Sequence, residues 1–222
     1  MQPDDVDHLD RLARRVDSPG PIAVVDPLSR NLLAAAQAAG LGDPGRWAVS
    51  GTDILLYGGG FGEYVPNSVS VEKVPDANGP DLFWQHPLWP GFPVVAGMAV
   101  TWWAPGLVAK GAALGQLRIE WYDAAGTRLS TGVTSTTDAP MVRTAPDGSA
   151  FMRPAVRFTA KGLWEMGPSV LAVGDSAAPL SAGERPVGDG CPPYSITRYT
   201  HAATAGNGAF RDITLELVEV TA

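Results

Sequence analysis

The sequence has little of what several common classes of protein require. It contains one cysteine, Cys191, in 222 residues, so no internal disulfide can form and the fold does not depend on an oxidising compartment. No apolar run approaches the roughly 20 residues of a membrane-spanning helix. Residues 4–17 are densely charged, whereas a secretory signal would be apolar. We therefore expect a chain that is made and folded in the cytoplasm without insertion into a membrane.

Basic residues are also scarce. Lysine occurs only as Lys73, Lys110 and Lys161, the arginines are scattered, and the net charge is −7. A nucleic-acid-binding protein usually has a basic face, because much of its affinity comes from neutralising phosphates. The composition therefore argues against DNA or RNA as a partner.

Residues of common catalytic and metal sites do not occur in recognisable patterns. The histidines, His8, His86 and His201, are not in H-E-x-x-H or another metal-binding spacing. No G-x-S-x-G nucleophile motif is present, and no feature of the sequence pairs Cys191 with a histidine. We therefore expect no catalytic residues, no metal and no cofactor, and we predict that the chain is not an enzyme.

Glycine and proline are abundant, with 26 and 20 residues, which is well above their average share. From Trp47 onward, short apolar or alternating runs recur about every 10–15 residues, separated by Gly, Pro, Asp and Asn. This pattern predicts an all-β jelly roll or β-sandwich, preceded by a short N-terminal helical arm. We expect residues 1–45 to form an N-terminal helix and extended anchoring arm, and residues 46–222 to form the jelly-roll sandwich.

The clearest local prediction is a hairpin in "QLRIEWYDAAGTRLSTG", residues 116–132. Asp123 can accept hydrogen bonds from N–H groups in the turn, and Gly126 can supply the positive φ that closes it. Carboxylates on the outer face of a strand, such as that of Glu120, are usually solvated. Alternation along the strand places one set of side chains inward (Leu117, Ile119, Trp121) and the other outward (Arg118, Glu120, Tyr122).

The segment "DDVDHLDRLARRVDSPGP" predicts a short amphipathic helix that Pro19, Gly20 and Pro21 end. Two interpretations remain open. The helix closes one end of the core, or it is an arm that docks on a neighbouring subunit. In the second interpretation, the assembly contacts come from an apolar face that includes Val6, Leu9 and Val16.

An aromatic loop, "LFWQHPLWPGFP" at Leu82–Pro93, is the most unusual segment. In one interpretation its aromatic side chains plug the end of the sandwich. In the other they present rigid rings to a sugar or to a partner protein, because a ring offers a large contact area with little loss of entropy. The candidate contact residues are Trp84, His86, Trp89 and Phe92.

Several motifs occur together in an order that resembles a known family. From "GMAVTWW" through "LRIEWYDAAGTRLSTG" and "TAPDGSAFMRPAVRF", the chain resembles the carbohydrate-binding-type jelly rolls of phage tail proteins. The segments "VGDGCPPYSITRY" and "RDITLELVEV" are similar to the end of minor tail proteins of tailed phages infecting actinobacteria. "SRNLLAAAQAAGLGDPGRWAVSG" is similar to the opening of those proteins. The resemblance covers about residues 31–220.

The resemblance implies a structural protein of the virion, either a minor tail protein or a surface-decorating one. Such a protein would be assembled in the host cytoplasm, anchored by its N-terminal arm, and would display a jelly roll toward the host surface. Its expected partners are other virion proteins and further copies of itself. The alternative function is that of a carbohydrate-binding module recognising host cell-wall glycan, and fold alone does not decide between these functions.

Overall fold

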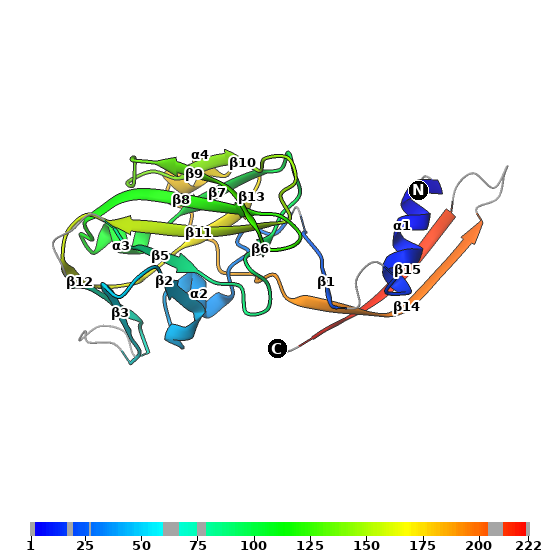
Figure 1. The fold of residues 1–222 in the computed structure, drawn as a ribbon, viewed down its shortest axis with the longest axis horizontal. Helices are drawn as coiled ribbons and strands as arrows, with labels where there is room; N and C mark the ends of the chain where they lie inside the picture. The colour runs from blue at the N-terminus through cyan, green and yellow to red at the C-terminus, as the bar shows by residue number, and fades with distance from the viewer. Residues whose placement is uncertain are drawn as a thin grey trace. The chain divides into compact units, whose positions relative to one another are not determined.

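The computed structural model describes residues 3–16, 20–26, 28–59, 67–74, 79–203 and 211–220. The chain forms two compact units, which Figure 1 shows as ribbons. The larger unit is Val25–Cys191, and the smaller unit combines Met1–Val24 with Pro192–Ala222. Each unit has its own sheet structure and is described separately below.

The larger unit is built from antiparallel sheets. Among the described residues, its largest sheet has six strands in the order β2-β5-β11-β8-β9, with β6 paired to β11. Two smaller sheets, counted over the same residues, have three strands each, in the orders β10-β7-β13 and β12-β4-β3. The strands are β2 (Trp47–Val49), β3 (Ile54–Tyr57), β4 (Ser70–Lys73), β5 (Asp81–Trp84), β6 (Phe92–Pro93), β7 (Ala99–Trp103), β8 (Leu114–Tyr122), β9 (Arg128–Thr134), β10 (Met141–Thr144), β11 (Phe151–Phe158), β12 (Gly162–Glu165) and β13 (Val170–Val173).

Helices in this unit are short. They are α2 (Ala35–Ala39), the 3-10 helix η1 (Pro44–Arg46), α3 (Pro105–Ala109) and α4 (Ala177–Ser181). Each occupies a connection between strands in the chain order. The predicted all-β sandwich is therefore confirmed, together with a short helix in the N-terminal part of the chain.

Two tryptophans join the six-stranded sheet to the sheet β10-β7-β13. Trp84 ends β5 and Trp102 lies in β7, and both are fully buried. Their rings meet edge to face with centroids 4.7 Å apart, an arrangement that aromatic pairs favour. Trp102 Nε1 also donates a hydrogen bond to the carbonyl oxygen of Ala155 in β11, at 3.0 Å. These two sheets therefore pack face to face around an apolar core.

Trp103 follows Trp102 in the same strand, so its side chain points to the opposite face of β7. It is also buried. Trp103 Nε1 donates to the carbonyl oxygen of Thr137 at 3.1 Å, and the Arg185 guanidinium lies over the ring, 4.7 Å from its centroid. At this position, the second face of the sheet is covered by other segments of the same unit.

The predicted hairpin is confirmed as β8 and β9. In the turn, the Asp123 carboxylate accepts hydrogen bonds from the backbone N–H groups of Ala125 and Thr127, at 2.9 and 2.8 Å. Gly126 has φ +79°, the left-handed region that favours glycine. The side chains expected to face inward are buried: Leu117, Ile119 and Trp121.

The smaller unit pairs a helix with a hairpin. Its sheet has the order β1-β14-β15, with β1 at Ile22–Ala23, β14 at Pro193–Ala203 and β15 at Arg211–Glu219. Helix α1 (Pro3–Ala13) contacts both β14 and β15, and the Tyr199 hydroxyl donates to the carbonyl oxygen of Val6 at 3.4 Å (Figure 1). The predicted N-terminal helix therefore has a docking surface within its own unit.

The buried side chain of Asn31 links three segments of the larger unit. Its Nδ2 donates to the carbonyl oxygens of Ser169 and Pro186, at 3.0 and 3.3 Å. Its Oδ1 accepts from the backbone N–H groups of Leu33 and Leu171, at 3.2 and 3.1 Å. A buried amide with all these partners stabilises the unit, because three of its four hydrogen bonds are buried and a buried backbone group that loses its partner is costly.

The boundary between the units differs from the one expected between residues 45 and 46. The segment around Asn31 belongs to the larger unit because its hydrogen bonds reach residues 138 to 155 positions later. The Asp189 carboxylate adds a bond from the backbone N–H of Arg30, at 2.9 Å. The C-terminal hairpin belongs to the smaller unit because β14 pairs with β1. Neither contact is visible from local composition, which set the expected boundary.

Replacing Asn31 with alanine should lower the free energy of unfolding by about 2–4 kcal/mol, because four backbone groups lose a buried partner. Urea unfolding followed by tryptophan fluorescence measures this change. Arg30→Ala is the matched control, since Arg30 and Glu184 form an exposed ion pair that contributes less than about 1 kcal/mol. Equal losses in the two variants would contradict the role assigned to Asn31.

Candidate functional site

The four candidate contact residues of the aromatic loop, Trp84, His86, Trp89 and Phe92, lie in different surroundings. Trp84 and Phe92 are 0% and 2% exposed and belong to the core of the larger unit. His86 is buried, and Trp89 is partly exposed. A sugar ring has no access to Trp84 or Phe92, so the structure supports the plugging interpretation for these two residues and leaves Trp89 as the accessible ring.

His86 fixes the conformation of this loop. Its Nδ1 accepts hydrogen bonds from the backbone N–H groups of Leu88 and Trp89, at 3.1 and 3.2 Å, so this nitrogen carries no proton. Its Nε2 lies 2.8 Å from the carbonyl oxygen of Cys191 and donates to it. Burial lowers the pKa of His86, and the hydrogen bond to Cys191 opposes this shift in part. The folded structure therefore stabilises the neutral form of the His86 imidazole.

Stacked rings continue from this loop onto the six-stranded sheet. The rings of His86 and Trp89 stack with centroids 4.6 Å apart, and Trp89 stacks on Phe151 of β11 at 6.3 Å. Phe151 is paired with Tyr122 of β8 in the strand register. The partly exposed aromatic side chains Trp89, Phe151 and Tyr122 therefore follow one another at one end of the sheet.

The side of the six-stranded sheet that faces away from the Trp84–Trp102 contact is here called the outer face. Alternation along each strand brings to it a set of charged and aromatic side chains. Its members are Asp81 and Phe83 of β5, Phe151, Arg153 and Arg157 of β11, Arg118, Glu120 and Tyr122 of β8, and Arg128 at the start of β9.

Glu120 lies at the centre of a hydrogen-bonded network on the outer face. Its carboxylate accepts from the Tyr122 hydroxyl at 2.5 Å, from Arg153 at 2.8 Å and from Arg128 at 3.2 Å. The expectation that Glu120 is solvated is therefore wrong, since the residue is 3% exposed. Long side chains from neighbouring strands cover it, and their positions depend on a register that the local sequence does not reveal.

Electrostatics in this network favour the ionised carboxylate. Burial raises the pKa of Glu120, but the hydrogen bonds from Tyr122, Arg153 and Arg128 outweigh that effect and hold the pKa below its ordinary value. Burial and the hydrogen bond to Glu120 raise the pKa of Tyr122 to about 12. At neutral pH, the network therefore contains a carboxylate, a neutral phenol and guanidinium groups.

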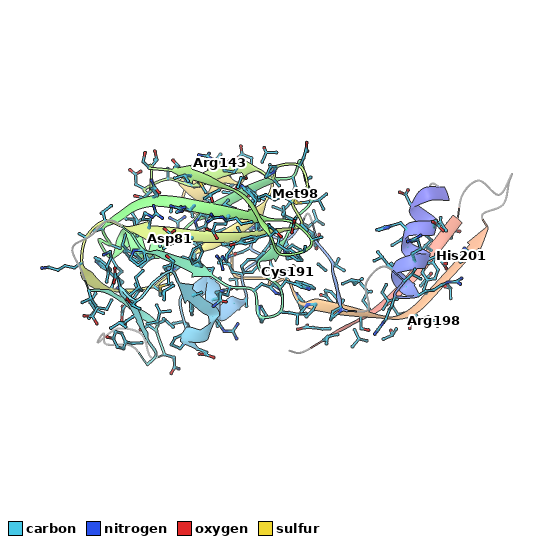
Figure 2. All side chains as sticks on the ribbon, viewed as in Figure 1. Asp81, Met98, Arg143, Cys191, Arg198 and His201 are labelled. Atoms are coloured by element: carbon cyan, nitrogen blue, oxygen red, sulfur yellow. The ribbon has the colours of Figure 1, made fainter. Side chains whose placement is uncertain are left out.

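A second charged cluster on the outer face joins Asp81 of β5 to Arg157 of β11 and to Arg118 of β8. Arg157 donates to both carboxylate oxygens of Asp81, at 2.8 and 2.9 Å, the bidentate geometry that suits a planar guanidinium. Arg118 Nε lies 3.6 Å from Asp81 Oδ2. Figure 2 labels Asp81 within the side chains of the larger unit.

Arg153 connects the charged and the aromatic parts of the outer face. Its guanidinium carbon lies 4.1 Å from the ring centroid of Phe83 and 5.3 Å from that of Tyr122, within the range of cation–π attraction. The Arg153 side chain therefore lies over the Phe83 ring and helps to keep that ring buried on the outer face of the sheet.

The remaining candidate chemical groups are not brought together. His8 is exposed on α1, and His201 is exposed on β14, where its ring stacks on Tyr199 with centroids 5.6 Å apart (Figure 2). Cys191 is buried, and burial raises the pKa of its thiol to about 11. Within the described ranges, no group of three or more His, Cys, Asp or Glu side chains is arranged to hold a metal ion.

The three residues expected to make assembly contacts differ in exposure. Val6 is buried, Leu9 is half-buried and Val16 is 61% exposed. Val6 belongs to the face of α1 that contacts the hairpin of its own unit, since its carbonyl oxygen accepts from Tyr199. Val16 follows the helix and remains accessible.

Comparisons with known proteins place the chain in no family. No family model matches its sequence, and no curated protein matches it. In the part of the chain that the structure describes, no helix is long and apolar enough to cross a membrane.

The state of His86 predicts a pH dependence of stability. Its folded pKa lies below the unfolded value, so its contribution is complete above a pH of about 6.5 and is lost as the pH falls below that value. Urea unfolding at pH 7.5 and at pH 5.0 should show a larger loss of stability for the wild type than for His86→Gln. His8→Gln, which changes an exposed histidine, should keep the wild-type difference, and an equal difference in all three proteins would refute the prediction.

Proposed function

We propose that this protein is a structural component of a tailed-phage virion, a minor tail or surface-decorating protein. The smaller unit attaches it to the particle, and the β-sandwich of the larger unit is displayed. The observation that carries the proposal is the smaller unit itself, a separate helix-and-hairpin element that joins the sandwich through two segments of chain. The sequence resemblance to minor tail proteins of phages infecting actinobacteria supports it.

The smaller unit leaves much apolar surface incompletely covered. In β15, residues 213, 215 and 217 are isoleucine and leucines that are only half-buried, and they alternate with exposed residues. By alternation, Val218 lies on the opposite face of the same strand, where it is 54% exposed, and Val16 after α1 is 61% exposed. Helix α1 has 11 residues and β1 has two, so together they cover only part of the hairpin that they contact. The apolar residues left accessible on both faces of the hairpin suit burial against another protein.

Assembly into a particle also fits the role proposed for the larger unit. Copies arranged by the symmetry of a virion would act together, so a contact with the host surface of only mM affinity becomes useful through multivalency. The partners we propose are other virion proteins and further copies of this chain, and the proposed location is the virion.

Val218→Asp should strongly reduce incorporation into particles while leaving the protein folded, because it places a charge on an exposed face of the hairpin that the assembly would bury. The variant is supplied from a plasmid during infection by a phage that lacks its own copy, and its amount in purified particles is measured by mass spectrometry. We expect a decrease of at least about tenfold, which corresponds to about 1.4 kcal/mol of attachment energy.

Val187→Asp is the matched control for this experiment. Val187 is 74% exposed and belongs to the larger unit, so the same chemical change there should leave incorporation normal. Circular dichroism and thermal unfolding of both purified variants establish that each is folded. Normal copy number of the Val218 variant would overturn the proposed attachment role.

A further inference from the structure

We propose that the outer face of the six-stranded sheet binds an acidic polysaccharide. Its aromatic rings would receive the faces of sugar residues, and its guanidinium groups would receive the carboxylate or phosphate groups. Of the four candidate contact residues predicted in the aromatic loop, Trp89 adjoins this surface, since its ring stacks on Phe151. The inference specifies the ligand of the displayed sandwich and rests on the proposed function for its biological setting, although binding itself can be tested on the purified protein.

The aromatic part of this surface is accessible and continuous. Trp89, Phe151 and Tyr122 are all partly exposed. Trp89 stacks on Phe151 at 6.3 Å, and Phe151 lies opposite Tyr122 across the β11–β8 pair. Rings held in this way offer a large contact area with little entropy to lose on binding. Sugar residues, which have apolar faces and polar edges, match such a row.

The charged part of the surface carries an excess of positive charge. Arg118, Arg128, Arg153 and Arg157 stand against the two carboxylates of Asp81 and Glu120, which gives a local balance of +2 in a chain whose net charge is −7. Each of these carboxylates is shared by two arginines. A neutral sugar would not require this excess, whereas a ligand with acidic groups would be complementary to it.

The arginines are held in place yet retain binding capacity. The side chains of Arg128, Arg153 and Arg157 are 60%, 28% and 32% exposed. Because Glu120 anchors Arg153 and Arg128 from below, little side-chain entropy is lost when they bind an anion.

The aromatic and charged parts meet at Arg153. Its guanidinium lies between the rings of Phe83 and Tyr122, at 4.1 and 5.3 Å from their centroids. A sugar stacked near Tyr122 would therefore place a substituent within reach of Arg153 and Arg128. This juxtaposition favours a polymer with an acidic group on the sugar or beside it over an anion that has no sugar.

The test uses the purified full-length protein and four probes. They are polygalacturonate, a sugar-phosphate polymer, neutral dextran, and inorganic polyphosphate as an anion without sugar. Affinity electrophoresis and isothermal titration calorimetry measure binding at low and high salt. We expect binding to at least one of the two acidic polysaccharides, weakened by salt as screening requires, with dextran and polyphosphate bound at least about tenfold more weakly. Which of the two acidic polymers binds more tightly identifies the acidic group.

Substitutions on each part of the surface complete the test. Trp89→Ala and Arg128→Gln change partly exposed side chains, and each should weaken binding about tenfold or more. Arg128→Gln and Arg153→Gln each remove a partner of buried Glu120. The double variants Arg128→Gln/Glu120→Gln and Arg153→Gln/Glu120→Gln, which leave no unpaired carboxylate, are therefore measured beside them. Arg30→Gln, at an exposed arginine that pairs with Glu184, is the control and should bind normally.

Several results would overturn the inference. They are absence of binding to both acidic polysaccharides, equal binding of dextran, or binding of polyphosphate that equals that of the acidic sugars and is insensitive to Trp89→Ala. Incorporation into particles is measured separately with the Val218 variant. The attachment role and the binding face can therefore fail independently.

Discussion

The strict alternation of side chains along β8 and β11 is the constraint on which the larger unit depends. One set of residues meets Trp84 and Trp102 inside the sandwich, and the other set must cover the outer face. Because the two strands pair in one fixed register, Glu120 and Arg153 are opposite each other, as are Phe151 and Tyr122. A shift by one residue would place charges in the core. The buried core and the charged outer face are thus two results of one register.

The outer face behaves unlike the solvated side of an ordinary sheet. Glu120 and Asp81 are nearly as buried as core residues, but each lies beneath guanidinium groups from neighbouring strands. The desolvation cost of burying both charges offsets much of their attraction, so these pairs fix the shape and charge of the surface more than they add net stability. The cation–π contact of Arg153 with Phe83 covers this ring with a charged group on the outside of the sheet. Specific shape and charge at this face are therefore fixed before any ligand arrives.

Local patterns in the sequence predicted the all-β fold and the β8–β9 hairpin with its turn at Asp123, because these features depend on neighbours a few residues apart. They did not predict the boundary between the units, since Asn31 bonds residues 138 to 155 positions away. The burial of Glu120 was missed for the same reason, because Arg153 comes from another strand. The aromatic loop was recognised as unusual, but only the structure separates buried Trp84 from accessible Trp89.

The smaller unit is formed by two chain segments that the larger unit separates in the sequence, and this order has a consequence for biosynthesis. Helix α1 leaves the ribosome before the sandwich, whereas β14 and β15, against which it packs, are translated only after all of Val25–Cys191. Domains generally fold as units during synthesis, in N-terminal to C-terminal order. The sandwich can therefore fold before the helix finds its hairpin. Incomplete translation products that end within the sandwich lack β14 and β15, so only chains translated through β15 can complete the smaller unit.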